Sequence, residues 1–228
     1  MSTRFADRAA AGRLLGQRLH ALGLQPPLIV LALPRGGVPV GAEVAQALQA
    51  PLDLLLVRKI GAPWQPELAL AAVVEGDPPD IVVDAPVQRG LGTHTEYIEA
   101  QAALQLREIA RQRQAYLSGR PAAPVQGSTV IVVDDGMATG TTMRAALKAL
   151  RRRRPAALVL AVPVAPRDTL EQLRGEVDQV VCLETPYPFF AVGEHYLRFA
   201  QVEDDEVIAA LAEAARARPG PTGAGWAL

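Results

Sequence analysis

Short apolar runs that alternate with helical patterns are the feature that most constrains the fold of this chain. The runs are rich in Val, Ile and Leu and nearly free of polar residues, which is typical of strands buried on both faces of a sheet. Between them, apolar residues recur at the spacing of helices that cover such a sheet. Repeated strand–helix units predict an α/β fold with a mainly parallel, twisted sheet flanked by helices. The expected core strands are 28–33, 52–57, 129–133, 157–162 and 179–183.

The remaining segments complete one expected domain over residues 1–216. Apolar runs at 68–74 and 81–83 are suited to pair as an antiparallel hairpin beyond a Gly/Pro-rich loop at 59–66. Residues 217–228 contain a Pro-Gly-Pro stretch and are expected to form a disordered tail. Helices are expected at 4–22, 38–48, 94–117, 141–153, 168–173 and 204–216.

The charge and cysteine content exclude several classes of function. The 228 residues carry 23 basic and 24 acidic side chains, and the net charge of −1 gives no long-range attraction for nucleic acid or an anionic membrane. Cys182 is the single cysteine and has no internal disulfide partner, while every apolar run is shorter than the roughly 18 residues of a membrane span. No signal peptide is evident. We therefore expect a cytoplasmic protein that binds neither nucleic acid nor membranes.

The most informative segment runs from Val130 to Thr142 and places two carboxylates and a small-residue loop after an apolar strand. Ligands of parallel sheets bind beyond the carboxyl ends of the strands, and the N–H groups at a helix N-terminus attract anions. The loop is therefore expected to hold a phosphate, with hydroxyl donors and a glycine that allows close approach. Its residues are Ala138, Thr139, Gly140, Thr141 and Thr142.

Asp134 and Asp135 precede this loop and would repel a phosphate, so they are expected to face vicinal hydroxyls or a hydrated Mg²⁺. A phosphorylated sugar with free hydroxyls fits both halves of the segment. The structural alternative is that the two acids cap the following helix and the threonines form a turn. A Walker loop is excluded because no Gly-Lys-Ser/Thr occurs, and a dinucleotide fingerprint is excluded because its glycine spacing is absent.

This segment resembles the phosphoribosyl-diphosphate (PRPP) binding motif of the type I phosphoribosyltransferases. The motif consists of four hydrophobic residues, two acids and small residues with Thr-Gly-x-Thr. The resemblance runs from about Phe5 to Leu211 and is closest to a branch of predicted phosphoribosyltransferases with unassigned acceptors, in which Pro-Arg-Gly-Gly-Val, Val-Arg-Lys and a late Val-Gly-x-x-Tyr recur. It implies that Asp134 and Asp135 contact the ribose 2- and 3-hydroxyls, and that residues 138–142 bind the 5-phosphate.

A second turn between a strand and a helix, Arg35-Gly36-Gly37, is a candidate site for the diphosphate. Arg35 offers a charged fork for diphosphate oxygens, and the two glycines free backbone N–H groups. By resemblance this turn matches the pyrophosphate loop that follows the first core strand. On residue types alone, the alternative is an ordinary turn.

Arg58 and Lys59 begin the segment that matches the flexible loop of the family, at about 59–80. The resemblance implies that this loop closes over the active site and brings both side chains to the leaving diphosphate, whereas the alternative is a solvated pair of surface charges. Of the 23 basic residues 21 are Arg, so the retained Lys59 favours a need for an ammonium group. Lys148 is expected on a polar helix face, without a function.

Aromatic residues concentrate between Pro186 and Tyr196 in a chain otherwise poor in them. Such rings either stack on a planar base or cover the end of the sheet. The resemblance assigns residues at about 184–200 to the hood that frames the acceptor, with His195 as a candidate contact. Enzymes of the family that act on 6-oxopurines commonly carry an acid where this chain has Ala138, which weakens hypoxanthine and guanine as acceptors.

These observations lead to the hypothesis of a Mg²⁺-dependent phosphoribosyltransferase. It would transfer the 5-phosphoribosyl group of PRPP to a nitrogenous acceptor, a nucleobase, and release diphosphate, with Asp134 and Asp135 as the residues nearest the metal. One alternative is a non-catalytic regulatory module that binds PRPP or a nucleotide. Another is a sugar-phosphate phosphatase with Asp134 as nucleophile, which no second signature supports. The expected partners are PRPP and an unidentified small acceptor, and a homodimer is left open.

Overall fold

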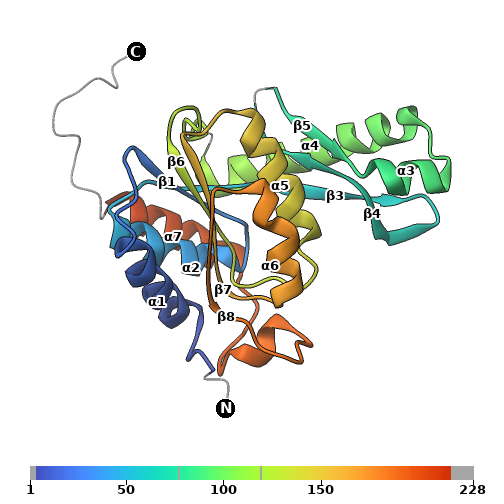
Figure 1. Ribbon diagram of the computed structural model, residues 1–228. Helices are drawn as coiled ribbons and strands as arrows, with labels where there is room; N and C mark the ends of the chain where they lie inside the picture. The colour runs from blue at the N-terminus through green and yellow to red at the C-terminus, as the bar shows by residue number, and fades with distance from the viewer. Residues whose placement is uncertain (1–3, 77, 119, 217–228) are drawn as a thin grey trace.

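The main sheet contains five parallel strands in the order β2-β1-β6-β7-β8 (Figure 1). This computed structural model describes residues 4–216 except 77 and 119, so the expected tail at 217–228 lies outside the described residues. The sheet confirms the predicted mainly parallel α/β fold. Its strands are β1 (Leu28–Ala32), β2 (Leu52–Leu54), β6 (Thr129–Val133), β7 (Ala157–Val164) and β8 (Gln179–Glu184).

Strands β1 and β6 are paired in register along their whole length, from Leu28 opposite Thr129 to Ala32 opposite Val133. Both strands therefore end at the same edge of the sheet, and the loops that follow them start side by side. The N–H of Leu33 continues the pairing by donating to the carbonyl of Val133 at 2.9 Å. This register places the Arg35-Gly36-Gly37 turn and the loop that begins at Asp134 beside each other.

Helices cover both faces of the main sheet, as Figure 1 shows. Helices α1 (Arg8–His20), α2 (Gly37–Leu48) and α7 (Asp204–Arg216) lie on one side. Helices α5 (Thr141–Arg152) and α6 (Arg167–Leu173) lie on the other, and a 3₁₀ turn at Arg174–Glu176 follows α6. Covering both faces removes the strand side chains from water, which explains why the strands read as unbroken apolar runs.

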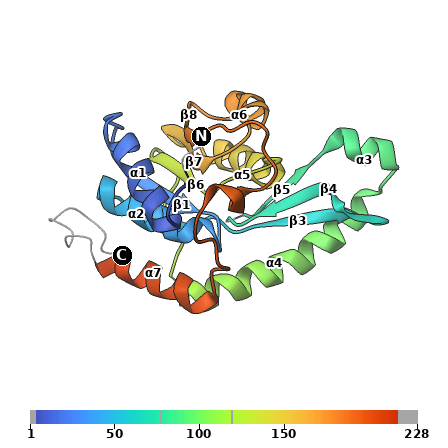
Figure 2. The same cartoon turned by 90° about the horizontal axis from the view of Figure 1, so that it is seen from below.

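A second sheet is antiparallel and extends away from the first together with two helices (Figure 2). The expected hairpin between 68–74 and 81–83 is present, but 59–66, expected as a loop, is mostly strand. The glycine and prolines of this segment lie in the turn between the first two strands of this sheet and at an irregularity in strand register near Gly61. Ile60 and Ala62 are buried, as in a strand that packs on a core. The elements are β3 (Val57–Ala62), β4 (Gln65–Val74), β5 (Asp80–Val83), α3 (Ala85–Leu91) and α4 (Thr95–Leu117).

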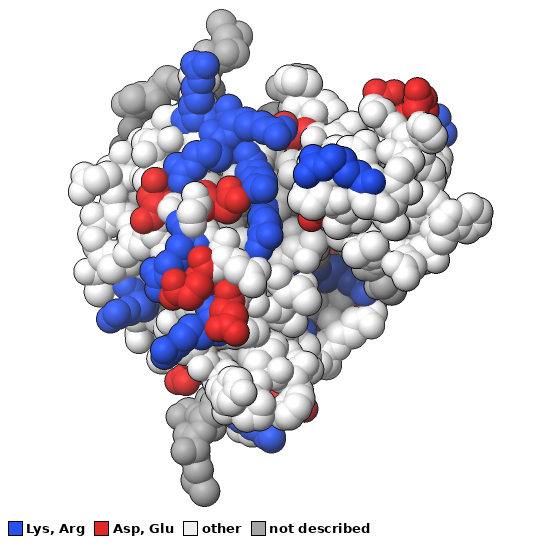
Figure 3. All heavy atoms as spheres, turned by 45° about the vertical axis from the view of Figure 1, so that its right-hand side comes forward, with Lys and Arg blue, Asp and Glu red and all other residues white. Residues whose placement is uncertain are grey.

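The surface charges are interleaved, as the face in Figure 3 shows. Three arginines at the end of helix α5, Arg151, Arg152 and Arg153, meet acidic or carbonyl groups. Arg151 pairs with Asp178 at 2.9 Å, and Arg152 pairs with Asp80 at 3.0 Å. Within the described part of the chain, no helix has the length and apolar character needed to cross a membrane.

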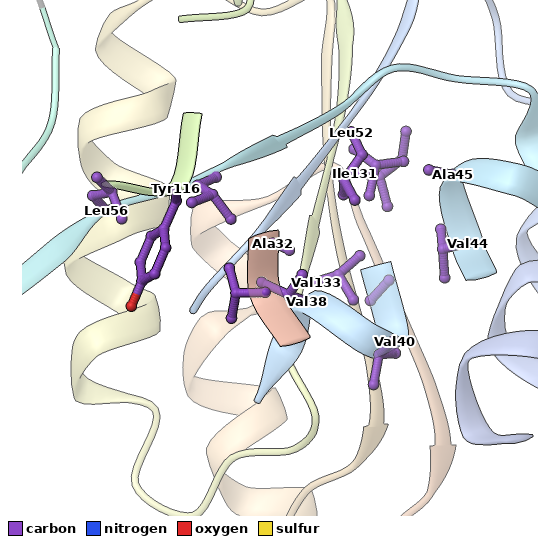
Figure 4. Packing of buried hydrophobic residues seen from close by; sticks show 14 of the residues in the cluster. Ala32, Val38, Val40, Val44, Ala45, Leu52, Leu56, Tyr116, Ile131 and Val133 are labelled. Atoms are coloured by element: carbon purple, nitrogen blue, oxygen red, sulfur yellow. The ribbon is translucent and has the colours of Figure 1, made fainter. Parts of the chain in front are cut away.

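The core follows the two faces of the main sheet. On one face, Val30, Ile131 and Val159 pack with residues of α1, α2 and α7, as the close view in Figure 4 shows for part of this cluster. On the opposite face, Ile29 and Val130 pack with the apolar side of α5. Neighbouring strand residues thus enter different clusters, which is the two-residue period of a strand with both faces buried.

Candidate active site

The loops that follow β1 and β6 touch through glycine and acid residues. An added Cβ on Gly36 would lie 2.1 Å from Oδ2 of Asp135, and one on Gly37 would lie 2.9 Å from Cα of Asp134. Real Cβ atoms are not found at such distances, so the two positions require glycine. The sequence-predicted diphosphate turn and acid pair are therefore brought together in one site, and Gly37 opens helix α2 at the same point.

The acid pair is half-buried, and the pKa of each carboxyl is raised. The N–H of Asp135 donates to Oδ1 of Asp134 at 2.9 Å. Burial raises the pKa of Asp134 well above its usual range, and the nearby Asp135 charge adds to the effect. Burial also raises the pKa of Asp135, although the Arg8 guanidinium acts in the opposite direction. Two carboxylates in such a position favour polar hydrogens or a cation as partners.

Arg8 is a site residue that the motifs did not reveal. Its Nε donates to Oδ2 of Asp135 at 2.7 Å, and both side chains are almost buried, at 12% and 13% exposure. Its Nη1 donates to the carbonyl of Ala200 at 2.7 Å, and its guanidinium lies 3.8 Å from the centroid of the Phe199 ring. Because Arg8 opens the first helix, only the folded chain brings it to the acid pair, and no local pattern indicates this contact.

The small-residue loop is anchored to β7 and α6 by hydrogen bonds and exposes most of its side chains to solvent. The N–H of Met137 donates to the carbonyl of Val164 at 3.1 Å, and Thr169 Oγ1 donates to the carbonyl of Ala138 at 2.6 Å. Gly140 has a φ of +67°, a conformation that favours glycine, and helix α5 begins at the next residue. The exposed members of the loop are Ala138, Thr139, Thr141 and Thr142. A phosphate at this helix start would meet both N–H and hydroxyl donors.

Lys59 lies beside this loop. A cavity of about 170 Å³ is lined by Lys59 and by three threonines of the loop, Thr139, Thr141 and Thr142. The fold of the second sheet therefore places Lys59 in one cavity with the predicted phosphate loop. Lys148, which we expected to have no function, lines the same cavity from helix α5.

Arg58 and Arg35 are directed away from these groups. Arg58 is the neighbour of Lys59 on β3, and its guanidinium pairs with Glu108 of α4 at 3.0 Å. Arg35 lies next to the glycine turn, but its Nη1 is 3.4 Å from Asp204 and 3.9 Å from Glu203 at the start of α7. The structure thus does not place either guanidinium with Lys59, and their roles at the diphosphate stay predictions.

The aromatic segment mainly covers the end of the sheet. Tyr196 is buried between the rings of Phe5 and Phe199, with centroids at 5.5 and 4.9 Å, and its hydroxyl donates to the carbonyl of Asp135 at 2.5 Å. His195 is buried and stacks on Phe189, and its Nε2 has no hydrogen-bond partner among the described residues. Tyr187 and Phe190 point into solvent instead, with 98% and 73% exposure.

Cys182 is partly buried on β8, and burial raises the pKa of its thiol to about 11. The thiol is therefore protonated at neutral pH. A protonated, partly buried cysteine behaves as a small, mainly apolar side chain.

A family described as the phosphoribosyl transferase domain matches residues 5–198, a span that contains both loops, the acid pair and the aromatic segment. The chain belongs to this family. Members of the family with similar sequences include "Putative phosphoribosyl transferase Rv0571c" and "Putative phosphoribosyl transferase MT0597" from two strains of Mycobacterium tuberculosis. Each is 46% identical over 212 residues, which cover 93% of this chain and 47% of the relative. The chain thus spans about half the length of these curated relatives.

The crystal structure of TT1426 from Thermus thermophilus shares this phosphoribosyltransferase fold. It is 44% identical to the present chain, with a TM-score of 0.81, and the match covers 92% of this chain and 99% of that one. The agreement extends over nearly the whole of both chains. The parallel sheet and its helices are therefore common to the two proteins, and the fold of the present chain is that of a type I phosphoribosyltransferase.

Proposed function

We propose that this chain transfers the 5-phosphoribosyl group of PRPP to the nitrogen of a nucleobase and releases diphosphate. The observation that carries the proposal is the contact between the Gly36-Gly37 turn and the Asp134-Asp135 pair, beside the small-residue loop. A sugar with a phosphate at one end and a diphosphate at the other has the right shape for three such groups at one sheet edge. The family of the chain supports the same reaction.

Each group has a role in this proposal. The loop at 138–142 holds the 5-phosphate through N–H and hydroxyl donors, and Asp134 and Asp135 accept hydrogen bonds from the ribose hydroxyls. The Gly36-Gly37 turn offers N–H groups to the diphosphate. Arg35 would contact the same group after exchanging its acidic partners on α7 for diphosphate oxygens. Because the reaction builds positive charge on the ribose and negative charge on the leaving group, positioning and electrostatic stabilisation dominate its rate.

The acid pair fits a Mg²⁺ ion that arrives with the substrate. Such ions keep several waters and bind proteins through one or two carboxylates together with substrate phosphates. The described residues contain no group of three His, Cys, Asp or Glu side chains able to hold a metal ion unaided, which agrees with a substrate-bound ion. When bound, Mg²⁺ would neutralise charge on the leaving diphosphate, and Asp134 and Asp135 would be its nearest carboxylates.

A regulatory module that binds PRPP without catalysis is the second candidate. The specific observation in its favour is that Asp135 is paired with Arg8 and Arg35 with α7, so two groups of the site have partners within the chain. Both candidate functions need PRPP to bind. They differ in whether diphosphate is released.

The deciding experiment measures diphosphate release with PRPP, Mg²⁺ and a panel of nucleobases. For the enzyme we expect release that depends on one base, and a loss of about 100-fold in kcat/KM for Asp135→Asn, a magnitude typical of removing one group that stabilises the transition state. Asp205→Asn, on the exposed side of α7, is the matched control and should keep the rate. Binding of PRPP without release for any base would favour the regulatory module, and no binding of PRPP would refute both.

A further inference from the structure

The cavity beside Lys59 extends past the phosphate loop, between helix α5 and the second sheet. One wall is aliphatic and comes from β4 and β5. The opposite wall is helix α5, where Thr141, Ala145 and Lys148 share one face because they are four and three residues apart. From Thr141 to Lys148 the helix rises by about 10 Å, so the cavity is longer than one phosphate group. The aliphatic residues are Ala69, Ala71, Ala72, Val82 and Val83.

Three cationic side chains line this cavity: Lys59 from β3, and Arg144 and Lys148 from α5. Asp84 is the one carboxylate among the described lining residues, and its Oδ1 already accepts from the N–H of Val87 at the start of α3. Three cations against one carboxylate leave a formal charge of +2 in the lining. A phosphate monoester carries about two negative charges near neutral pH and would balance it.

Arg144 and Lys148 have partners within the chain, but these partners leave some of their N–H donors able to bind a ligand. Lys148 Nζ is 3.6 Å from Glu176, a distance beyond a direct hydrogen bond. Arg144 Nη2 donates to Gln172 at 2.8 Å, but the Nε of Arg144 is buried without a partner among the described residues. A buried donor of this kind is costly unless a ligand or water accepts from it.

We propose that the part of this cavity beside Arg144 and Lys148 is a second phosphate site, next to the loop at 138–142 that holds the 5-phosphate. Arg144 and Lys148 hold the phosphate of a small organic monoester, and the apolar part of that ligand packs on the aliphatic wall of β4 and β5. This site takes a ligand other than the substrates of the transferase reaction proposed above, although the two ligands share one cavity. It gives the chain a second ligand, whose binding contacts both the phosphate loop and the second sheet.

The test is a calorimetric titration of the full chain with phenyl phosphate, a phosphate on a flat apolar ring, while ribose 5-phosphate saturates the loop. We expect phenyl phosphate to bind with one further equivalent, and Arg144→Gln and Lys148→Gln each to weaken it at least tenfold. Arg151→Gln removes the same charge from the same helix outside the cavity and is the control, expected to bind as the wild type. Affinity for ribose 5-phosphate should change less than twofold in all three variants.

Displacement of phenyl phosphate by ribose 5-phosphate would overturn the proposal, because the two would then share the loop. Equal weakening by Arg151→Gln, or no binding of phenyl phosphate at all, would overturn it too. If Arg144→Gln lowers the melting temperature strongly, Lys148→Gln alone decides the outcome, since Lys148 is exposed. Failure of ribose 5-phosphate to bind would speak against the proposed transferase, and the titration with phenyl phosphate alone would still test this site through the variants.

Discussion

Gly36 and Gly37 explain why two loops from distant parts of the sequence form one site. Only hydrogen separates the backbone of Gly36 from the carboxylate of Asp135, and Gly37 lies against the backbone of Asp134. The sequence predicted both glycines as aids to anion binding. Their contact with the acid pair could not be predicted, because it depends on which strands become neighbours in the sheet.

At Gly36, substitution by alanine should damage ligand binding more than folding. The added Cβ would force the Asp135 carboxylate to move, because it lies 2.1 Å away. We expect at least a tenfold loss in the affinity for PRPP, measured by calorimetry. Gly90→Ala, in α3 with no atom within 4 Å of the added Cβ, is the control and should bind as the wild type. Equal affinities in the two variants would contradict this account.

Asp134 should give the protein a pH-dependent stability. Burial raises the pKa of Asp134 in the folded state, so the folded protein keeps a proton at pH values where the unfolded chain has lost it. The free energy of unfolding therefore falls as pH rises from the ordinary pKa of Asp through the raised one. Asp134→Asn has no carboxyl to ionise at this position. The free energy of unfolding of the variant should therefore rise relative to that of the wild type as pH rises, by about 1.4 kcal/mol for each unit of pKa shift. Urea unfolding of both proteins at pH 4 and pH 7.5 measures it. A difference that is independent of pH would disprove the explanation.

At the scale of elements, the start of helix α1 and the segment from Tyr196 to Ala200 both contact the loop after β6; we call these contacts the clasp. Arg8 contacts Asp135, Phe199 and the carbonyl of Ala200, and Tyr196 donates to the carbonyl of Asp135. The helix itself was predictable from its periodicity. Its role in the site was not, since the contact joins residues far apart in sequence.

Breaking this clasp should destabilise the fold. Arg8→Gln would leave the largely buried carboxylate of Asp135 without its cation, and we expect a loss of about 2–3 kcal/mol in the free energy of unfolding. Arg198→Gln is the control within the same clasp, because Arg198 is exposed and pairs with Asp7. An exposed pair contributes at most about 1 kcal/mol. Chemical denaturation of the two variants compares them, and similar losses would argue against a special role for Arg8.

Sequence patterns located the parallel strands well and the second sheet less well. Unbroken apolar runs such as 129–133 mark strands with two buried faces, and the structure confirms them. The run at 52–57 is instead divided between β2 and the start of β3, because Leu55 and Leu56 lie between the two sheets in the chain. Helix α3 was missed: it is short and begins after Asp84, whose side chain caps it. Such local caps are weaker signals than periodicity.

For the molecule as a whole, the second sheet with α3 and α4 is a projecting part next to the main sheet (Figure 2). Its turn carries Trp64, which is 93% exposed, and Lys59 on the same sheet lies beside the phosphate loop. The expectation that residues 59–80 close over a ligand stays a prediction. So do the single domain at 1–216, the hood at 184–200 and the homodimer.

Trp64 can report on such a closure. In a Trp226→Phe background, Trp64 is the remaining tryptophan, and its exposure predicts the fluorescence emission of a tryptophan in contact with water. If the turn closes over bound PRPP and Mg²⁺, the emission should shift to the blue and iodide should quench it less. Emission and quenching that stay the same at saturating PRPP would show that the turn remains in solvent when the ligand is bound.

The in-register pairing of β1 with β6 has a consequence for folding. Leu28 pairs with Thr129, 101 residues later, so the groups of the site meet only when contacts between distant parts of the chain have formed. Contacts of long sequence separation slow folding, and no fragment that contains only one of the two loops would carry the site. A ligand that bridges both loops binds the native state alone and raises its stability by mass action. Ligand-induced stabilisation is therefore a direct measure of correct strand order in this chain.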